Sequence, residues 1–275
     1  MINYLKESTF AVNDVIQKAW GITKKHYFSI ATLCFLMFIT ASASSLMAFF
    51  IKDVSRVLSF FMVVIFIMLY FTINLSLFKY IFHLIDNEDE EVTIVGTLPT
   101  RHQIIRFLVA TLYFVGCILF VGMLLVPILW ILDPVLRYLV NIGWVEDFTA
   151  TGKTITSIAI GVALVAIFVT WLRISFFPFF ILDKGSAPFE SIKLSLATTK
   201  GNFTKILLLL MILGGGYLIY LLLNYLQLPF IAFIVNILSS FIIVPLSSVA
   251  LTVAYRKISS EYKGDEHPDI LHNIV

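Results

Sequence analysis

Arg173 is the residue whose type and position point most directly to chemistry, because it lies within a long apolar run. An arginine in the hydrocarbon region of a bilayer costs about 2.5 kcal/mol or more unless it is paired or reaches the interface. We expect a partner in Asn74 or in the carbonyl of Ile174, which Pro178 cannot bond within a helix. The alternatives for Arg173 are therefore a structural role, contact with an anionic group such as a lipid phosphate, and transport.

Two lysines in the segment PFESIKLSLATTK (188–200) are the other candidates for contact with an anion. Lys193 and Lys200 flank a narrow apolar stripe of this segment, and Ser191, Ser195 and Thr198 form a hydroxyl stripe beside it. If the protein binds lipid, we expect Arg173, Lys193 and Lys200 to contact the head group.

Catalysis and metal binding are not indicated by the sequence. The five histidines show no metal-ligand spacing, and no nucleophile, base and orienting group can be assembled. The long apolar runs contain no Asp or Glu, whereas proton-coupled transporters usually need a carboxylate within the membrane. We therefore predict a non-enzymatic protein with no catalytic residues, no metal and no cofactor.

The composition is that of an integral membrane protein, since 60% of the residues are hydrophobic, only 13% are charged, and the mean hydropathy is +0.97. A bilayer core about 30 Å thick needs roughly 20 apolar residues per helical span. The prediction is one all-α polytopic domain, 1–275, with six transmembrane helices and no binding of nucleic acid. The six predicted spans are 27–51, 57–82, 104–132, 155–182, 203–226 and 230–255.

The spans are expected to form three antiparallel hairpins, each preceded by a cytoplasmic amphipathic helix. Interfacial helices are predicted at 8–26 and 186–200. Most of the 19 lysines and arginines lie on one side of the predicted spans, which places both termini in the cytoplasm by the positive-inside rule. The predicted hairpins and tail are 27–82, 92–182 with a long external loop at 133–154, 203–255, and a cytoplasmic tail at 256–275.

Two segments that lead into spans align without gaps. KAWGITKKHYF (18–28) falls on KLSLATTKGNF (193–203), and a degenerate third copy is TLPTRHQIIRF (97–107). Internal repetition of this kind is common in membrane proteins. The alignment predicts three repeated units, the third weakly. The matched pairs are Lys18 with Lys193, Thr23 with Thr198, Lys25 with Lys200, and Phe28 with Phe203.

The region from 176 to 209 resembles the YciC-like bacterial inner-membrane proteins and the membrane-anchor region of certain glycerophosphodiester phosphodiesterases. The shared pattern is an apolar span that ends in an acidic residue, a short glycine turn, and a helix that enters the next span. The resemblance implies six spans and a bacterial inner-membrane location, but no activity. The matching positions are Asp183, Gly185, Ser195, Thr199, Lys200, Gly201, Asn202 and Phe203, with Ala19, Trp20, Lys25 and Phe28 near the N-terminus.

Apolar chains with short loops usually need partners to act on anything. The expected function is therefore that of an accessory or scaffold subunit in an envelope or membrane-biogenesis complex, with membrane lipids and other membrane proteins as partners. The alternative is a carrier or binder of a lipid or small amphiphile.

Overall fold

The computed structural model describes residues 11–51, 55–87, 94–142 and 148–261. The described part of the chain is all helical, which confirms the predicted fold class. Its elements are α1 (Val12–Lys25), α2 (Tyr27–Ile51), α3 (Arg56–Asp86), the 3-10 helix η2 (Ile94–Thr97), α4 (Arg101–Asn141), α5 (Phe148–Ile174), α6 (Phe177–Asp183), α7 (Pro188–Lys200), α8 (Phe203–Leu213), α9 (Gly215–Tyr225) and α10 (Pro229–Glu261).

Five helices of the described chain are long and apolar enough to cross a membrane, so the protein is a multi-pass membrane protein. A sixth candidate exists only if α7 and α8 are counted together, and these two helices meet at a bend of 92°. The predicted span 203–226 is instead divided at Gly214 into α8 and α9, each of 11 residues.

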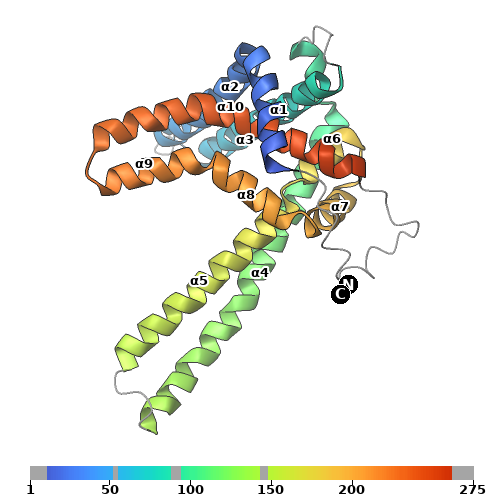
Figure 1. The fold of residues 1–275 in the computed structure, drawn as a ribbon. Coiled ribbons are helices and arrows are strands. Elements are labelled where there is room, and N and C mark those ends of the chain that lie inside the picture. Colours follow the sequence, from blue (N-terminus) through green and yellow to red (C-terminus); the bar gives the residue numbers. More distant parts are fainter. Residues whose placement is uncertain (1–10, 52–54, 88–93, 143–147, 262–275) are drawn as a thin grey trace.

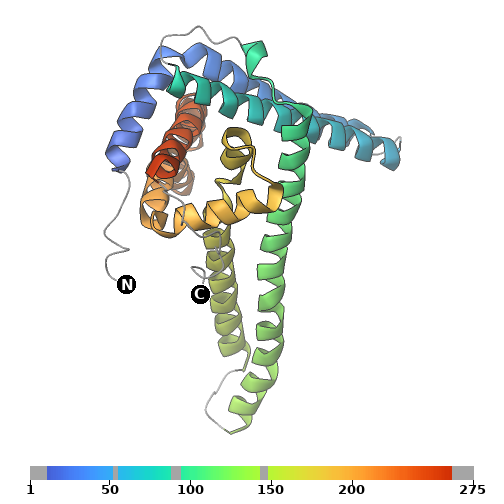
Figure 2. The same cartoon turned by 90° about the vertical axis from the view of Figure 1, so that its right-hand side faces the viewer.

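Three helical hairpins leave a common hub in three different directions, as Figures 1 and 2 show. The pairs are α2 with α3, α4 with α5, and α9 with α10. The hub consists of α1, α6, α7, the start of α8, and the C-terminal ends of α3 and α10. Because the hairpins diverge, no more than 22% of the most apolar window of any spanning helix is buried within the protein.

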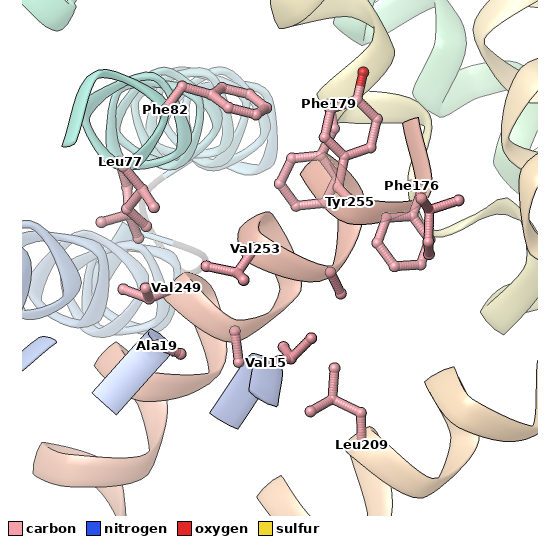
Figure 3. Close-up of a cluster of buried hydrophobic side chains, with 14 of the residues drawn as sticks. Val15, Ala19, Leu77, Phe82, Phe176, Phe179, Leu209, Val249, Val253 and Tyr255 are labelled. Atoms are coloured by element: carbon pink, nitrogen blue, oxygen red, sulfur yellow. The ribbon is translucent and has the colours of Figure 1, made fainter. Parts of the chain in front are cut away.

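The hub is held by a hydrophobic core to which the amphipathic helix α1 contributes one face. Val15 and Ala19 of α1 are fully buried and lie against Val249 and Val253 of α10 (Figure 3). The opposite face of α1 carries its lysines and remains exposed. The core thus joins the first and last described helices of the chain.

Aromatic rings continue this core toward α3 and α6. Tyr255 of α10 is 1% exposed, and its ring centroid lies 5.7 Å from that of Phe82, 5.2 Å from that of Phe179 and 5.0 Å from that of Phe180. Each such aromatic pair contributes about 0.5–1.5 kcal/mol beyond the area it buries. The ring cluster therefore fixes the ends of α3, α6 and α10 against one another.

The second hairpin differs from the sequence prediction at both ends. The long external loop expected at 133–154 is mostly helix, because α4 runs without interruption for 41 residues to Asn141 and α5 begins at Phe148. A continuous helix satisfies most of its backbone polar groups internally, and only Pro127 and Pro134 lack an N–H to donate. Tyr138, on this extension of α4, is 65% exposed.

At its other end, the hairpin has no separate amphipathic helix before it within the described residues. The chain forms only η2 and then enters α4 directly at Arg101. Ser76 of α3 holds this turn by a hydrogen bond to the Thr97 carbonyl at 3.3 Å, and Lys79 donates to the Leu98 carbonyl at 3.1 Å. A short turn bonded to α3 thus replaces the expected third interfacial helix.

Candidate functional site: the polar contacts of the hub

The fourth predicted span is broken at the hub. α5 ends at Ile174 and α6 begins at Phe177. Pro178 lies in the first turn of α6, where its missing N–H cannot bond the carbonyl of Ile174 and where its ring is tolerated. The break leaves backbone groups of residues 173–176 in need of partners within a buried region.

Two hydroxyls of α7 supply those partners. Ser195 Oγ donates to the carbonyl of Arg173 at 2.8 Å and accepts from the backbone N–H of Phe176 at 3.2 Å. Thr199 Oγ1 lies 3.1 Å from the same Arg173 carbonyl. Ser195 and Thr199 are both fully buried. Part of the hydroxyl stripe seen in the sequence therefore stabilises the break between α5 and α6.

The Arg173 side chain is paired, but not with the partners predicted from the sequence. Its Nη2 donates to the carbonyl of Leu196 at 3.1 Å, because α7 packs directly on α5. The structure gives it no hydrogen bond to Asn74 or Ile174, both of which are described residues. Asn74 Nδ2 instead lies 4.0 Å from Met37 Sδ. The buried Nε of Arg173 has no partner in the described chain.

Lys193 and Lys200 lie on the same helix, α7, that binds Arg173. Lys193 is half-buried, with its Nζ 4.8 Å from the centre of the Phe189 ring. Lys200 is exposed in the last turn of α7, where a cation interacts favourably with the helix dipole. The three predicted anion contacts are thus all on or against α7, and Arg173 already makes a bond within the protein.

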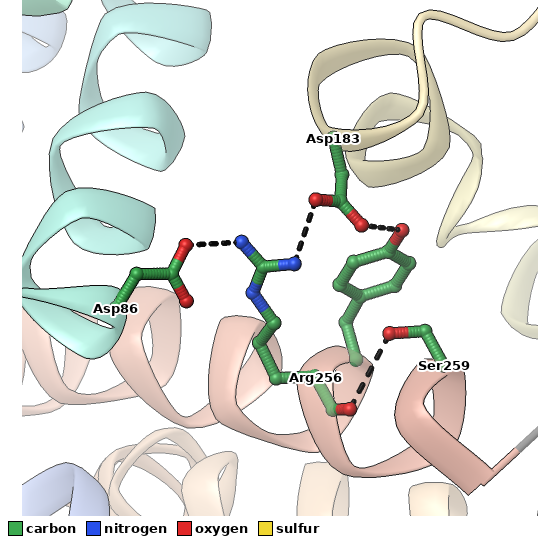
Figure 4. A network of polar contacts seen from close by, with 5 residues as sticks. Asp86, Asp183, Arg256 and Ser259 are labelled. Carbon is green, nitrogen blue, oxygen red and sulfur yellow. Dashed lines mark hydrogen bonds and ion pairs between the residues drawn. The ribbon is translucent and has the colours of Figure 1, made fainter.

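A charged network that the sequence did not indicate joins three helices at the hub (Figure 4). Arg256 of α10 forms ion pairs with Asp183 of α6, at 2.6 Å, and with Asp86 of α3. The Tyr255 hydroxyl donates to the other oxygen of Asp183 at 2.8 Å. The guanidinium also lies 4.5 Å from the centre of the Phe82 ring. The network links α3, α6 and α10 through one arginine.

The two ion pairs of Arg256 differ in their exposure to solvent. The side chain of Asp183 is 18% exposed, that of Arg256 27%, and that of Asp86 46%. A less exposed pair is less screened by water and salt. The pairing of these two aspartates could not be predicted from the sequence, because residues 72 or more positions from their partners give no local pairing signal.

Gly185 forms the turn between α6 and α7 and also contacts another hairpin. Its φ of +61° is in the left-handed region that favours glycine. Its carbonyl accepts a hydrogen bond from the side chain of Arg106 of α4. The glycine turn noted in the sequence thereby connects the second hairpin to the hub.

The side chains matched in the sequence repeat are similarly buried in one pair and differently buried in another. Thr23 and Thr198 are both buried, at 2% and 5% exposure. Phe28 is 86% exposed, whereas Phe203 is half-buried against the core. Internal repetition stays a prediction.

A basic cavity of about 240 Å³ lies where α1 passes the end of α3. It is lined by Lys18, Lys25 and His26, together with Gly21, Ile22 and Leu84. Partial burial and the nearby Lys25 charge lower the pKa of His26 below its usual value. The cavity therefore brings together the positive charges of Lys18 and Lys25, which the sequence alone did not indicate.

The main charged groups of the hub bond one another. The described residues contain no group of three or more His, Cys, Asp or Glu side chains that could hold a metal ion. Comparison with protein-family models, with curated proteins and with solved structures gives no match to this chain.

Proposed function

We propose that the protein is a non-enzymatic scaffold subunit that holds other membrane proteins around its three hairpins. The observation that carries this proposal is the divergence of the hairpins from one hub. In each of the five spanning segments, at most 22% of the most apolar window is buried within the protein, so most of its residues keep apolar surface facing outward. Separate apolar surfaces in fixed directions suit simultaneous contact with several partners.

A scaffold also needs a hub that keeps its hairpins at defined angles. The Arg256 network ties α3, α6 and α10 together, and the Arg106 bond to Gly185 connects α4 to the same region. Ion pairs and hydrogen bonds are directional, so they restrict the arrangement of helices more than apolar contact alone. These contacts support a rigid arrangement.

The location and orientation are part of the proposal. A bacterial inner membrane with both termini in the cytoplasm is supported by the distribution of lysine and arginine along the sequence. The likeness to YciC-like proteins remains a prediction that rests on the short motif around Gly185 and Lys200.

The proposal is tested by photocrosslinking in native membranes. A photoreactive phenylalanine analogue is placed on each hairpin, at Phe60 of α3, Leu119 of α4 and Phe233 of α10, which are 65%, 56% and 59% exposed, and at the fully buried Phe180 as a control. We expect one discrete protein adduct from each exposed position and only intramolecular products from the control. Absence of protein adducts from exposed positions on all three hairpins would refute the scaffold function.

A second candidate function, binding of an anionic lipid, is favoured by the basic cavity at α1. Lys18 and His26 there could contact a head-group phosphate at the membrane surface. The test compares Lys18→Gln with Lys193→Gln after gentle purification, using native mass spectrometry to measure retained phosphatidylglycerol. If only Lys18→Gln loses the lipid, the lipid site is at the cavity. If only Lys193→Gln loses it, the site is at α7.

A further inference from the structure

A cavity of about 520 Å³ lies within the membrane-spanning part of the protein, between α2, α3 and α10. Its walls are the faces of α2 and α10 that lie opposite each other, and α3 contributes Tyr70 and Leu77. The volume is within the range of roughly 300–1,000 Å³ that is typical of small-molecule sites. The cavity is distinct from the hub contacts described above.

The wall of this cavity is mainly hydrocarbon. Phe35 and Phe38 of α2 and Ile237 and Val244 of α10 line it, together with the small side chains of Ala31 and Ala41. All of these residues belong to helices that can cross a membrane, where lipid is the surrounding solvent. An apolar cavity in that position is filled favourably by a hydrocarbon chain.

One side of the cavity is held together by a specific hydrogen bond. Pro245 in α10 has no N–H to donate to the Phe241 carbonyl one turn earlier. The hydroxyl of Tyr27 at the start of α2 donates to that carbonyl instead, at 3.2 Å. Pro245 therefore removes one helix hydrogen bond, but the Phe241 carbonyl stays paired. The hydrogen bond from Tyr27 joins α2 to α10 beside the cavity.

Polar side chains on the same wall are not all satisfied within the described protein. The Ser240 hydroxyl donates to the Asn236 carbonyl at 2.8 Å and the Ser248 hydroxyl to the Val244 carbonyl at 3.1 Å. Asn236, which is exposed on the apolar surface of α10, and the half-buried Tyr70 also line the cavity, and the structure gives their side chains no hydrogen bond to the described residues. Unpaired donors are costly in a medium that offers no acceptor.

We propose that this cavity binds one ester-linked acyl chain of a membrane phospholipid, with the ester carbonyl accepting a hydrogen bond from the Asn236 amide. The chain lies against the aromatic and aliphatic wall, and the carbonyl supplies the acceptor that the protein lacks there. The acyl ester is the common source of a carbonyl joined to a long hydrocarbon chain within a bilayer. This inference is independent of the scaffold function, because it concerns the cavity between α2, α3 and α10 and not the outer surfaces of the hairpins.

The experiment uses the full chain in nanodiscs of phosphatidylcholine that contains a diazirine on its acyl chain. Crosslinks mapped by mass spectrometry are expected in α2 from residues 31–41 and in α10 from residues 236–248. Ala41→Trp fills the cavity and should reduce these crosslinks severalfold. Gly116→Trp is the matched control, because a Cβ at Gly116 of α4 meets nothing within 4 Å and the cavity is elsewhere.

Lipid chemistry provides the decisive comparison. Ether-linked phosphatidylcholine has the same head group and chains but lacks the ester carbonyl. We expect about two- to tenfold stronger competition by the ester lipid, the range for one net hydrogen bond. Asn236→Leu should remove this preference while it preserves an apolar wall, and size-exclusion chromatography checks that each variant stays folded.

Three results would overturn the proposal. Crosslinks of equal density on all exposed spans would indicate ordinary surrounding lipid. Equal competition by the ester and ether lipids would remove the role of Asn236. A protein crosslinked in native membranes from a photoreactive residue at position 237, in place of lipid, would assign the cavity to a protein partner.

Discussion

Arg256 offers the sharpest test of how the hub is held, because its guanidinium pairs with two aspartates in different surroundings. Three single substitutions are needed, Arg256→Met, Asp183→Asn and Asp86→Asn, together with the two double variants that contain Arg256→Met. Each pair of aspartate and arginine then forms a double-mutant cycle that isolates its own interaction energy. Both cycles share one arginine, so each serves as a control for the other.

The magnitudes follow from exposure and bonding. Asp183 is 18% exposed and also accepts from Tyr255, so its pair with Arg256 resembles a hydrogen bond to a charged group, worth about 1.5–3 kcal/mol. Asp86 is 46% exposed, and its pair should contribute only about 0.2–1 kcal/mol. Arg256→Met also removes the contact with the Phe82 ring, but this loss cancels within each cycle.

The assay is reversible unfolding in mixed detergent micelles, followed by tryptophan fluorescence and circular dichroism. We expect a larger coupling energy for Asp183 than for Asp86, and a greater reduction of the Asp86 coupling in high salt. Equal couplings, or a larger value for Asp86, would refute the assignment of Asp183 as the main anchor of the hub.

Three further predictions concern single positions. Gly216→Ala should destabilise the α9–α10 hairpin by about 1–3 kcal/mol, because a Cβ there would lie 2.5 Å from Ile243 Cδ1 and 2.6 Å from Ser239 Oγ. The control is Gly215→Ala, whose Cβ would meet nothing within 4 Å and which should be neutral or stabilising in the same unfolding assay. Ser195→Ala should cost about 1–3 kcal/mol, since it leaves buried backbone groups at the α5–α6 break unpaired, and a stability equal to wild type would contradict this role. His26 has a pKa below its usual 6.5, so the free energy of unfolding should fall as the pH drops below about 6.5, where the unfolded chain binds the proton first; His26→Gln should remove that part of the pH dependence.

Much of the helical architecture could be predicted from the sequence because apolar runs of sufficient length leave few alternatives in a bilayer. The position of the proline in α6 likewise predicted that the carbonyl of Ile174 would lose its helical bond. The sequence could not show that Ser195 and Thr199 would satisfy that region, because their partners lie 19 to 26 residues away in the chain. It also placed the partner of Arg173 incorrectly, since Leu196 contributes only its backbone carbonyl, a group that every residue has.

The sequence by itself determined that this chain is helical, apolar and multi-pass, because composition and local hydrophobic length decide whether a segment can lie in lipid. Only the tertiary structure decided that the hairpins diverge, that Asp86, Asp183, Tyr255 and Arg256 form one network, and that a cavity opens between α2, α3 and α10. These features depend on the angles at which distant helices cross. Such angles arise from the packing of many side chains at once, so no short stretch of sequence contains them.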